Sequence, residues 1–324
     1  MEHQRELRGM DETGQRVGII GSGAMGTLFG YHLAERCQVT MLDSNPAVID
    51  EIERSGGISV NDAPPRRVRA GRKSRDLFGS NVVFLFVKAV DTLRALRPFA
   101  GELSPSTPIV SLQNGVGNED AIKTALGGAV PVVLGITTES SFTTAPGRVR
   151  SSEQGNTIIG SGGASPATSR SVAELLTQCG MRAAVVYDIR PHLWGKLVAN
   201  AAINAVSALL DCQAGEILKE PNAARLAEAL AEEAAAVAAA LKINLPFANP
   251  WHYVAEVIAV GADSKSSMAY DLETGHPSEI DHINGAVCAA GRRTGVPTPY
   301  NDAMVRLIKA REGLMRAHKT QPSP

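Results

Sequence analysis

Residues 17–26 read VGIIGSGAMG, and their glycines follow the pattern G-x-G-x-x-G. An apolar run precedes the glycines, and residues 24–35 continue with the spacing of an amphipathic helix. In such a loop the first glycine allows a tight turn, the second lets the backbone approach a pyrophosphate, and the third lets helix pack on strand. The helix N-terminus stabilises the bound negative charge. The expected dinucleotide contacts are Gly21, Ser22, Gly23, Ala24, Met25 and Gly26.

The chain around this loop alternates short apolar runs with helical patterns up to about residue 187. The expected strands are residues 17–20, 39–43, 82–87, 108–113, 130–136, 157–160 and 183–187. The expected helices are residues 24–35, 46–54, 90–100, 118–126 and 167–179. Several strands are apolar almost throughout, which is typical of strands covered on both faces. The alternation predicts an α/β fold with a Rossmann-type doubly wound parallel sheet.

The second half of the chain has long helical periods and no strand signal. The expected helices are residues 189–211, 221–242, 249–262, 278–294 and 300–315. The Ala-rich helix at 221–242 either packs inside this all-α domain or pairs with a second copy in a homodimer. The expected parts are a dinucleotide-binding domain at 16–187, a helical substrate and dimerisation domain at 188–317, and disordered tails at 1–15 and 318–324.

The composition of the 324 residues excludes several classes of protein. Lys and Arg (32) nearly balance Asp and Glu (33), which argues against a nucleic-acid or membrane-surface partner. The first fifteen residues lack the apolar segment of a signal peptide, and no run approaches the roughly 18 apolar residues of a membrane span. The four cysteines form no CxxC pair, so we expect a cytoplasmic protein without a metal site or a disulfide framework.

The identity of the dinucleotide depends on Asp43, which closes the second expected strand 22 residues beyond Gly21. Its carboxylate can accept both adenosine ribose hydroxyls and would repel a 2′-phosphate, which favours NADH. The basic stretch PPRRVRAGRKSR at 64–75 is the counter-argument, because it could bind the phosphate of NADPH. Solvated surface charge is the favoured interpretation of that stretch. Both cofactors stay open, with NADH preferred.

Polar residues follow two other expected strands. Lys88 comes after the apolar run 82–87, and Asn114 lies in an Asn-Gly turn after the run 108–113. Ligands of an open α/β sheet bind beyond the carboxyl ends of its strands. Lys88 could therefore hold a substrate carboxylate or a cofactor ribose. Asn114 could serve the site or simply form the turn, since Asn-Gly is a common turn pair.

The helical stretch LWGKLVANAAINAVSALL at 193–210 is mostly apolar but carries Lys196, Asn200 and Asn204. Four-residue steps place these three side chains on one helical face. Burying them costs several kcal/mol unless each finds a partner. We expect the face to line a polar site. The alternative is that the lysine reaches solvent and the asparagines bond to nearby backbone.

A second polar set, SKSSMAYDLETGHPSEIDHING, occupies residues 264–285. Ser278 is the expected N-cap of the helix at 278–294, with Glu279 and Asp281 in its first turn. Carboxylates in a first turn favour the helix dipole, which is sufficient to explain Asp281. Glu279 could in addition be the partner of a buried cation elsewhere.

The motifs GSGAMG, FVKA, QNGVG, LWGKLVANAAIN, SSMAYDLETG and EIDHINGAV, in this order and spacing, resemble the 2-dehydropantoate 2-reductase (ketopantoate reductase) family over residues 16–315. The resemblance implies reduction of ketopantoate, a 2-oxo acid, to pantoate in pantothenate and coenzyme A biosynthesis. It also implies NADPH on the glycine loop and substrate in a cleft between the two domains. The alternatives are a reductase of another branched 2-oxo or 3-oxo acid and, with less support, a non-catalytic dinucleotide-sensing module.

Transferred residue by residue, the resemblance also implies individual roles. The catalytic lysine of the family falls on Lys196 and its acidic partner on Glu279. Asn200 and Asn204 match the asparagines that hold the substrate. The remaining matches are Ser266 or Ser267 near the substrate carboxylate, Lys88 and Asn114 near cofactor and substrate, and Glu279 near the cofactor.

Three positions depart from the family pattern. Ala205 stands where the family often has proline, and His276–Ser278 replaces an Arg-x-Thr. These two changes are compatible with a different substrate side chain. Asp43 replaces the basic residue of members that select the 2′-phosphate, which again favours NADH.

The implied chemistry makes Lys196 the proton donor as hydride attacks the 2-oxo carbon. Burial lowers the pKa of a lysine, and a neighbouring carboxylate raises it. We expect the two effects on Lys196 to be comparable, so that the amine stays protonated at neutral pH.

Overall fold

The computed structural model describes residues 14–128 and 130–320, so residues 1–13 and 321–324 of the expected tails lie outside the described residues. The chain divides into two compact units. The first comprises the chain up to Gln113 and Asn118–Ile189, and the second comprises Asn114–Gly117 and the chain from Arg190 onward. The second unit therefore begins two residues after the expected position 188, and it includes a short turn from the middle of the expected first domain.

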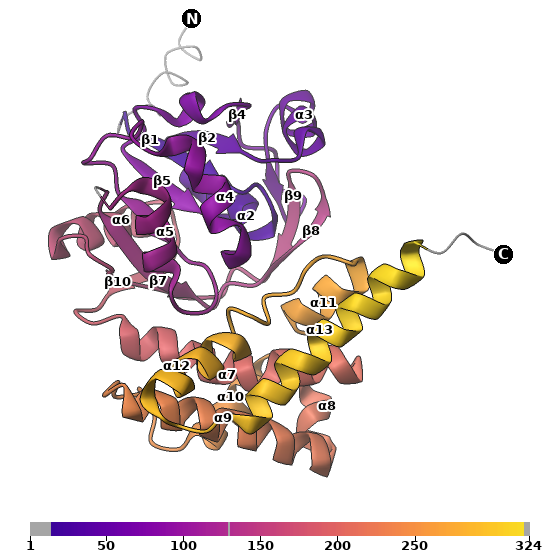
Figure 1. Ribbon diagram of the computed structural model, residues 1–324. Helices are drawn as coiled ribbons and strands as arrows, with labels where there is room; N and C mark the ends of the chain where they lie inside the picture. Colours follow the sequence, from indigo (N-terminus) through magenta and orange to yellow (C-terminus); the bar gives the residue numbers. More distant parts are fainter. Residues whose placement is uncertain (1–13, 129, 321–324) are drawn as a thin grey trace, which may run out of the picture. The chain divides into compact units, whose positions relative to one another are not determined.

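An eight-stranded sheet organises the first unit (Figure 1). Its order is β11-β10-β7-β6-β5-β1-β2-β4, and all neighbours are parallel except β7 and β10. The strands are β1 Arg16–Ile20, β2 Gln38–Leu42, β4 Arg69–Gly71, β5 Val82–Leu85, β6 Ile109–Ser111, β7 Val132–Thr137, β10 Thr157–Ser161 and β11 Ala183–Val185. From β4 to β7 this is the order of doubly wound dinucleotide-binding sheets, with its switch point between β1 and β5. The predicted Rossmann-type fold is confirmed.

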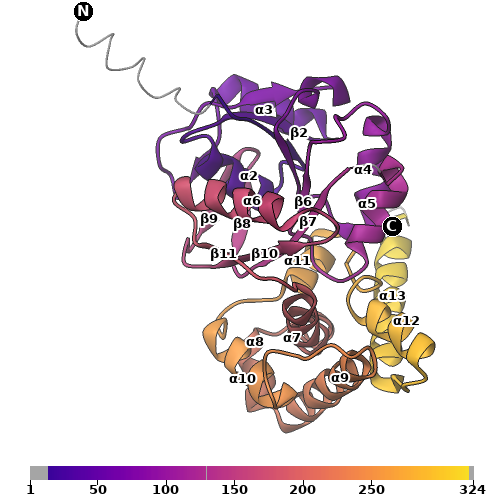
Figure 2. The ribbon, with the colours of Figure 1, turned by 90° about the vertical axis from the view of Figure 1, so that its left-hand side faces the viewer.

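Helices cover both faces of this sheet. They are α2 Ala24–Leu33, α3 Pro46–Ser55, α4 Thr92–Leu96, α5 Asn118–Leu126 and α6 Pro166–Gln178. Phe29 of α2, Ile49 of α3 and Leu176 of α6 join one apolar core against the sheet. Figure 2 shows α4 and α5 on the opposite side of the sheet from α2 and α6. This two-sided burial explains why β1 and β5 contain runs of apolar residues.

The expected helix at 90–100 is divided into three short pieces. They are the 3-10 turn η2 Ala89–Asp91, the helix α4 and the 3-10 turn η3 Arg97–Phe99. Pro98 lies at the start of η3. Because proline has no N–H and clashes with the preceding helical turn, a continuous helix cannot pass through it.

Four short strands escaped prediction. One is β4, in the Arg-rich stretch, and the others form a second sheet in the order β3-β9-β8. Their bounds are β3 Ser59–Val60, β8 Ser141–Ala145 and β9 Arg148–Ser151. The hairpin between β8 and β9 closes at Gly147, which has a φ of 72°. These strands are short and rich in Ser, Thr and Arg, so they lack the apolar runs from which buried strands are predicted.

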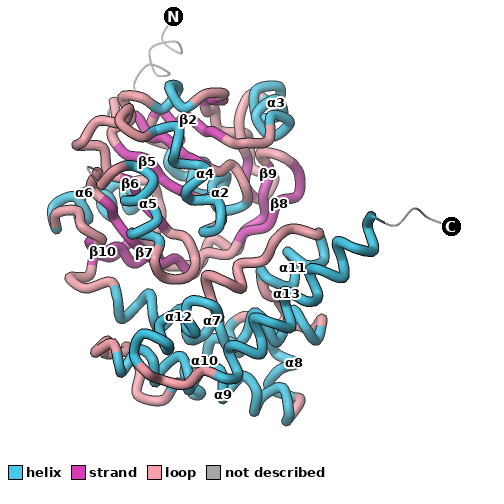
Figure 3. Tube along the Cα trace, viewed as in Figure 1, coloured by secondary structure: helices cyan, strands magenta, loops and turns pink. Residues whose placement is uncertain are grey.

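Within residues 190–320 the second unit consists of helices joined by loops and contains no strand, as predicted (Figure 3). Its helices are α7 Arg190–Leu210, α8 Ala214–Lys219, α9 Pro221–Ala240, α10 Pro250–Val260, α11 Ser267–Thr274, α12 Asn284–Thr294 and α13 Pro299–Thr320. The sequence did not predict α8 and α11. Helix α11 nevertheless has a regular start and end, because Ser266 caps it and Gly275 leaves it in the left-handed conformation. Helix α13 continues to Thr320, three residues into the expected disordered tail.

Helix α9 packs inside the unit, which is the first of the two alternatives for the Ala-rich segment. Its buried face includes Ala227, Ala231 and Ala234, and these small side chains let it approach α7. Ala201 and Ala205 of α7 are fully buried in the same core. Close packing of small residues therefore places α7 at the centre of the helices α9, α10, α11 and α13.

Helix α7 has 21 residues, and an 18-residue window within it has a mean hydropathy of 1.3, so the helix could cross a membrane by length and composition alone. No such run was expected from the sequence. In the structure 72% of this window is buried among the other helices of the unit. A buried helix of a packed domain meets the same criterion, so the apolar composition of α7 is accounted for by its central position.

Candidate active site

The glycine loop joins β1 to α2, and two of its glycines have no room for a side chain. Gly21 has a φ of 98°, and a Cβ there would lie 2.8 Å from the backbone nitrogen of Val87. A Cβ on Gly26 would lie 1.8 Å from the carbonyl oxygen of Gly21. At Gly23, by contrast, a Cβ would meet no atom within 4 Å. The loop is therefore closed at its first and third glycines and open at its second.

The open side of the loop carries unused hydrogen-bonding groups. Gly23 is the N-cap of α2, and no side chain caps this helix among the described residues. The hydroxyl of Ser22 is buried, and residues 14–128 and 130–320 offer it no hydrogen-bond partner. Free N–H groups and a positive helix end favour a phosphate group. The loop thus has the features that a pyrophosphate requires.

Asp43 lies just beyond β2 and is fixed against this loop. Its Oδ2 accepts a hydrogen bond from the N–H of Ser22 at 2.7 Å, and its Oδ1 accepts one from the N–H of Asn45 at 2.8 Å. A carboxylate has about four acceptor positions, so two remain for a ligand. The arrangement holds a hydrogen-bond acceptor at the end of β2, where an adenosine ribose binds in such sheets.

The basic stretch at 64–75 forms ion pairs inside the first unit. Arg66 lies over the ring of Tyr31 and pairs with Glu35 at 3.1 Å. Arg72 pairs with Asp50 and Glu53 of α3 at 2.7 and 2.6 Å. Arg69 also lies 4.0 Å from Asp76, so three of the six basic residues of the stretch form surface ion pairs, which weakens the case for a phosphate site there.

Lys88 is half-buried and follows β5 by three residues, as the N-cap of η2. The N–H of Phe86 donates to the carbonyl of Ile20 at 2.8 Å, so the segment leading to Lys88 lies beside the glycine loop. Gln113 was not singled out in the sequence. Its amide donates to the carbonyl of Val87 and to the hydroxyl of Thr92, both at 2.8 Å. Gln113 therefore fixes the same segment from β6.

The polar face of α7 lies in the second unit. Lys196 and Asn200 are half-buried, and Asn204 is only 7% exposed. Neither asparagine amide has a hydrogen-bond partner within the described part of the chain. The alternative that these amides bond to nearby backbone is therefore not what the structure shows. Unpaired amides on a partly buried face are donors and acceptors for a ligand.

The charge state of Lys196 is set by burial and by Glu279. Burial lowers the pKa of Lys196 from its usual 10.5 to about 8, and the negative charge of Glu279 acts in the opposite direction. From the sequence we expect the two effects on the pKa to be comparable, but in the structure burial is the stronger. The amine is still mostly protonated at pH 7, because its pKa lies about one unit higher.

Glu279 occupies a turn and not the first turn of a helix, which corrects the prediction. Helix α12 begins at Asn284, and the carbonyl of Glu279 accepts the N–H groups of His282 and Ile283 at 3.0 Å each. Ser278 is consequently not an N-cap. Its N–H donates instead to Glu312 of α13, and Asp281 pairs with Lys309 of the same helix. Contacts with α13, remote in sequence, replace the local capping that was expected.

The Asn-Gly turn packs against the turn of Glu279. The side-chain amide of Asn114 donates to Oε2 of Glu279 at 3.0 Å. Gly115 has a φ of 82°, and a Cβ there would lie 2.2 Å from the carbonyl oxygen of His282. Asn114 is thus both a turn former and a neighbour of the candidate acid. The glycine after it is required by backbone conformation and by this close approach.

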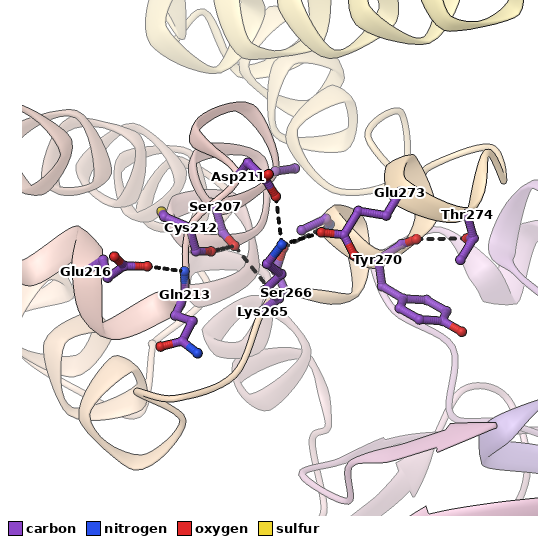
Figure 4. Close-up of polar contacts among 12 residues, drawn as sticks. Ser207, Asp211, Cys212, Gln213, Glu216, Lys265, Ser266, Tyr270, Glu273 and Thr274 are labelled. Carbon is purple, nitrogen blue, oxygen red and sulfur yellow. Dashed lines mark hydrogen bonds and ion pairs between the residues drawn. The ribbon is translucent and has the colours of Figure 1, made fainter. Parts of the chain in front are cut away.

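The structure separates the two candidate serines. The hydroxyl of Ser266 donates to the carbonyl of Asn204 and accepts the N–H of Ala269, both at 3.1 Å. Its N–H donates to the hydroxyl of Ser207 at 3.3 Å (Figure 4). Ser266 therefore ties α11 to α7, whereas Ser267 is exposed at the first position of α11. Ser267 is the serine whose hydroxyl is free to meet a ligand.

A cluster of ion pairs next to Ser266 also connects α7 with α11. Lys265 lies between Asp211 and Glu273, at 2.8 Å from Asp211 (Figure 4). The hydrogen bonds that Lys265 donates to Asp211 and Glu273 raise the pKa of its amine. This lysine therefore stays charged and links the end of α7 to α11. Across residues 14–128 and 130–320, no group of three or more His, Cys, Asp or Glu side chains could hold a metal ion.

Comparison with known proteins finds two family models that match the chain. The model of ketopantoate reductase PanE/ApbA matches residues 17–163, and that of its C-terminal part matches residues 188–312. The 2-dehydropantoate 2-reductase of Pyrobaculum aerophilum is 36% identical over 301 residues, covering 91% of this chain and 98% of the relative.

Two solved structures are similar over nearly the whole chain. A PanE/ApbA family ketopantoate reductase from Ralstonia eutropha is 27% identical with a TM-score of 0.84, over 93% of this chain and all of that one. A D-mandelate dehydrogenase bound to NADH and anilino(oxo)acetate is 25% identical with a TM-score of 0.85, over the same 93% and 100%.

Proposed function

The chain belongs to the ketopantoate reductase (PanE/ApbA) family of NAD(P)H-dependent oxidoreductases, and we propose that it reduces 2-dehydropantoate to pantoate with Lys196 as the general acid. Bound NAD(P)H supplies a hydride to the 2-oxo carbon. Lys196 supplies the proton to the carbonyl oxygen, so that one hydride and one proton complete the alcohol. The reaction places the enzyme in pantothenate and coenzyme A biosynthesis.

The observation that carries the proposal is the partly buried Lys196 amine, whose pKa of about 8 lies near neutral pH. A general acid is most effective when its pKa is close to the working pH. The amine also provides positive charge where negative charge develops on the oxygen, an effect worth about 3–4 kcal/mol for a well-placed donor. Glu279 opposes the effect of burial and keeps enough of the amine protonated.

The remaining polar groups of the second unit have roles in holding the substrate. Asn200 and Asn204 offer unpaired amides on the face of Lys196, and we assign them to the hydroxyl and carboxylate of the substrate. Ser267 takes the carboxylate contact in preference to Ser266, because the hydroxyl of Ser266 already caps α11. Asn114 acts on Glu279 through its hydrogen bond.

The first unit fits a dinucleotide. The open side of Gly23, the uncapped start of α2 and the unpartnered hydroxyl of Ser22 suit a pyrophosphate. Asp43 would accept the adenosine ribose hydroxyls and repel a 2′-phosphate, so we propose NADH as the preferred cofactor. The ion pairs of Arg66 and Arg72 support this choice, since they already engage two basic side chains. We assign Lys88, beyond β5, to the cofactor ribose.

The experiment that tests this function is the oxidation of cofactor at 340 nm with purified protein and 2-dehydropantoate. We expect turnover with NADH to exceed that with NADPH in kcat/KM. In Asp43→Asn the carboxylate charge is lost, and the ratio is expected to move towards NADPH by about tenfold. No oxidation of either cofactor would contradict the proposed substrate, and a wild-type preference for NADPH would contradict the role of Asp43.

A second substrate class is favoured by one observation, the similarity to the D-mandelate dehydrogenase. Its ligand is an aromatic analogue of a 2-oxo acid, so phenylglyoxylate belongs in the same assay. His276 and Ser278, the sequence features that pointed to another substrate, lend no support. His276 is exposed and hydrogen-bonds Thr274, and the N–H of Ser278 is bound by Glu312. Faster turnover of phenylglyoxylate than of 2-dehydropantoate would make this the principal activity.

We further propose that the chain forms a weak homodimer through α13. The exposed face of this helix carries apolar residues at heptad spacing, namely Tyr300, Ala303, Leu307, Ala310, Leu314 and Ala317. When two copies pair in antiparallel orientation, each large side chain meets an alanine, so the face is self-complementary. Six side chains cover less than the roughly 800 Å² per partner of a stable interface. We therefore expect a dissociation constant on the order of micromolar.

A further inference from the structure

The turn that carries Glu279 is closed by hydrogen bonds of its own backbone. Its carbonyl bonds to His282 and Ile283 close the turn on itself. Such bonds fix the backbone conformation within the turn, and they do not determine where the turn lies relative to α7. Contacts from outside the turn therefore help to place the Glu279 carboxylate, and one of them is the hydrogen bond from Asn114.

Two side chains of α13 hold this turn on either side of Glu279. Glu312 accepts the N–H of Ser278 at 2.8 Å, and Lys309 pairs with Asp281 at 2.7 Å. Residues 309 and 312 are three apart and so lie on the same face of the helix. The helix presents one cation and one anion to the residues that flank Glu279.

The same helix is tied to α7, which carries Lys196. Arg311, between the two anchors, donates to the carbonyl groups of Ala208 and Leu209 at the end of α7, with a distance of 3.2 Å to Leu209. Near its start, Asn301 accepts a hydrogen bond from Asn284, which also donates to the carbonyl of Ala201, both at 3.0 Å. Helix α13 thus shares fixed points with α7 and with the turn.

We propose that Glu312 and Lys309 are positioning residues that hold Glu279 in place beside Lys196 for the reductase reaction. This inference rests on the proposed function. Glu312 is the more important of the two, because its carboxylate is half-buried and accepts a backbone N–H. The Lys309–Asp281 pair is about half exposed on both sides and is screened by salt.

The positioning role has a signature in the pH dependence of turnover. Burial lowers the pKa of Lys196, and the charge of Glu279 raises it. If Glu279 moves away, its opposing effect weakens and the pKa of Lys196 falls below about 8. Reduction requires the protonated amine, so the decline of kcat at alkaline pH begins at a lower pH.

The test compares Glu312→Ala with Glu312→Gln in the full-length protein. We expect Glu312→Ala to lower kcat at pH 8 roughly tenfold and to lower it less at pH 6, with the alkaline limb moved to lower pH. Glu312→Gln keeps a carbonyl acceptor for Ser278 and should restore most of the rate. Asp302→Ala is the matched control, because Asp302 pairs with Arg306 on the same helix.

Three results would overturn the proposal. Glu312→Ala could keep the wild-type kcat and the wild-type alkaline decline of kcat, or it could lose kcat equally at all pH values with that decline unmoved. The third such result is that Glu312→Gln fails to restore kcat. Lys309→Gln provides a second variant if Glu312→Ala does not fold, and it should move the limb in the same direction by a smaller amount. An inactive wild-type protein would instead refute the proposed function, so the two failures are distinguishable.

Discussion

Asn114 donates a hydrogen bond to Glu279 across 3.0 Å, although 165 positions separate them in the chain. Both residues belong to the second unit, because the turn at Asn114–Gly117 leaves the strand-rich part of the chain. Gly115 allows the contact, since a side chain there would collide with the carbonyl of His282. Glu279 therefore accepts a hydrogen bond from an amide and also acts electrostatically on Lys196.

The first prediction concerns Glu279→Gln and the pH dependence of kcat. The charge of Glu279 raises the pKa of Lys196 against the effect of burial, so its removal lowers that pKa below about 8. Lys196 must be protonated to act as the acid, and kcat falls as the pH rises through its pKa. We expect the alkaline limb of the kcat profile to move to lower pH. A limb at the wild-type position would exclude electrostatic control by Glu279.

The second prediction distinguishes two glycines of the loop. Gly26→Ala places a Cβ 1.8 Å from the carbonyl oxygen of Gly21 and should destabilise the protein by several kcal/mol. Gly23→Ala meets no atom within 4 Å, so the protein should unfold at nearly the wild-type temperature. Its methyl group, however, enters the space reserved for pyrophosphate, and NADH affinity should fall at least about tenfold.

Thermal unfolding and fluorescence titration with NADH check this pair of variants. Wild-type NADH affinity in Gly23→Ala would show that the open side of the loop is not where the cofactor lies. Wild-type stability in Gly26→Ala would show that the helix can shift away from the strand.

The third prediction concerns stability, because partial burial of a lysine lowers the free energy of unfolding. The pKa of Lys196 is about 8 in the folded state against 10.5 for a free lysine. The folded protein therefore binds fewer protons between these values, and stability rises with pH across that window. Lys196→Met removes the penalty and should raise the free energy of unfolding by about 1–3 kcal/mol at pH 7. The gain should shrink towards pH 10.

Urea denaturation at pH 7 and pH 10 measures the effect. Lys219→Met is the control, since Lys219 is exposed and its replacement should change stability by less than about 0.5 kcal/mol. A destabilised Lys196→Met protein would show that Lys196 contributes more through its contacts than it costs through burial.

The fourth prediction tests the homodimer. Leu307 is 52% exposed in the middle of the apolar face of α13, and Leu307→Glu should abolish association by placing a charge there. Sedimentation velocity over a range of protein concentrations measures this association. Val260→Glu is the control, because Val260 is 92% exposed on α10. A concentration-independent monomer in the wild type would refute the dimer.

Much of the fold could be predicted from local sequence patterns. Local sequence predicts local structure at the glycines 21, 23 and 26, in the apolar strands around them and in the helical periods after residue 188. The alternation of strands and helices then predicts the fold class. The short strands β8 and β9 could not be found in this way, because they are stabilised by pairing with each other and have exposed faces.

The details of the site were harder to predict, because they also depend on contacts between residues that are distant in the sequence. Lys196, Asn200 and Asn204 share a helical face, which local periodicity reveals. The position of Glu279 does not follow from periodicity, since the favourable first-turn pattern around Ser278 predicted a helix that begins five residues too early. The N–H of Ser278 bonds to Glu312, 34 residues away, and only the tertiary structure shows that partner.

The most direct test of the account is the rate of NADH oxidation by Lys196→Ala with 2-dehydropantoate, measured beside NADH binding by the same protein. We predict a fall in kcat of at least about a hundredfold, because general acid catalysis contributes about 10²–10⁴ in rate. NADH affinity should be unchanged, since the glycine loop and Asp43 belong to the other unit. A kcat within a few fold of the wild type would contradict the assignment of Lys196 as the acid.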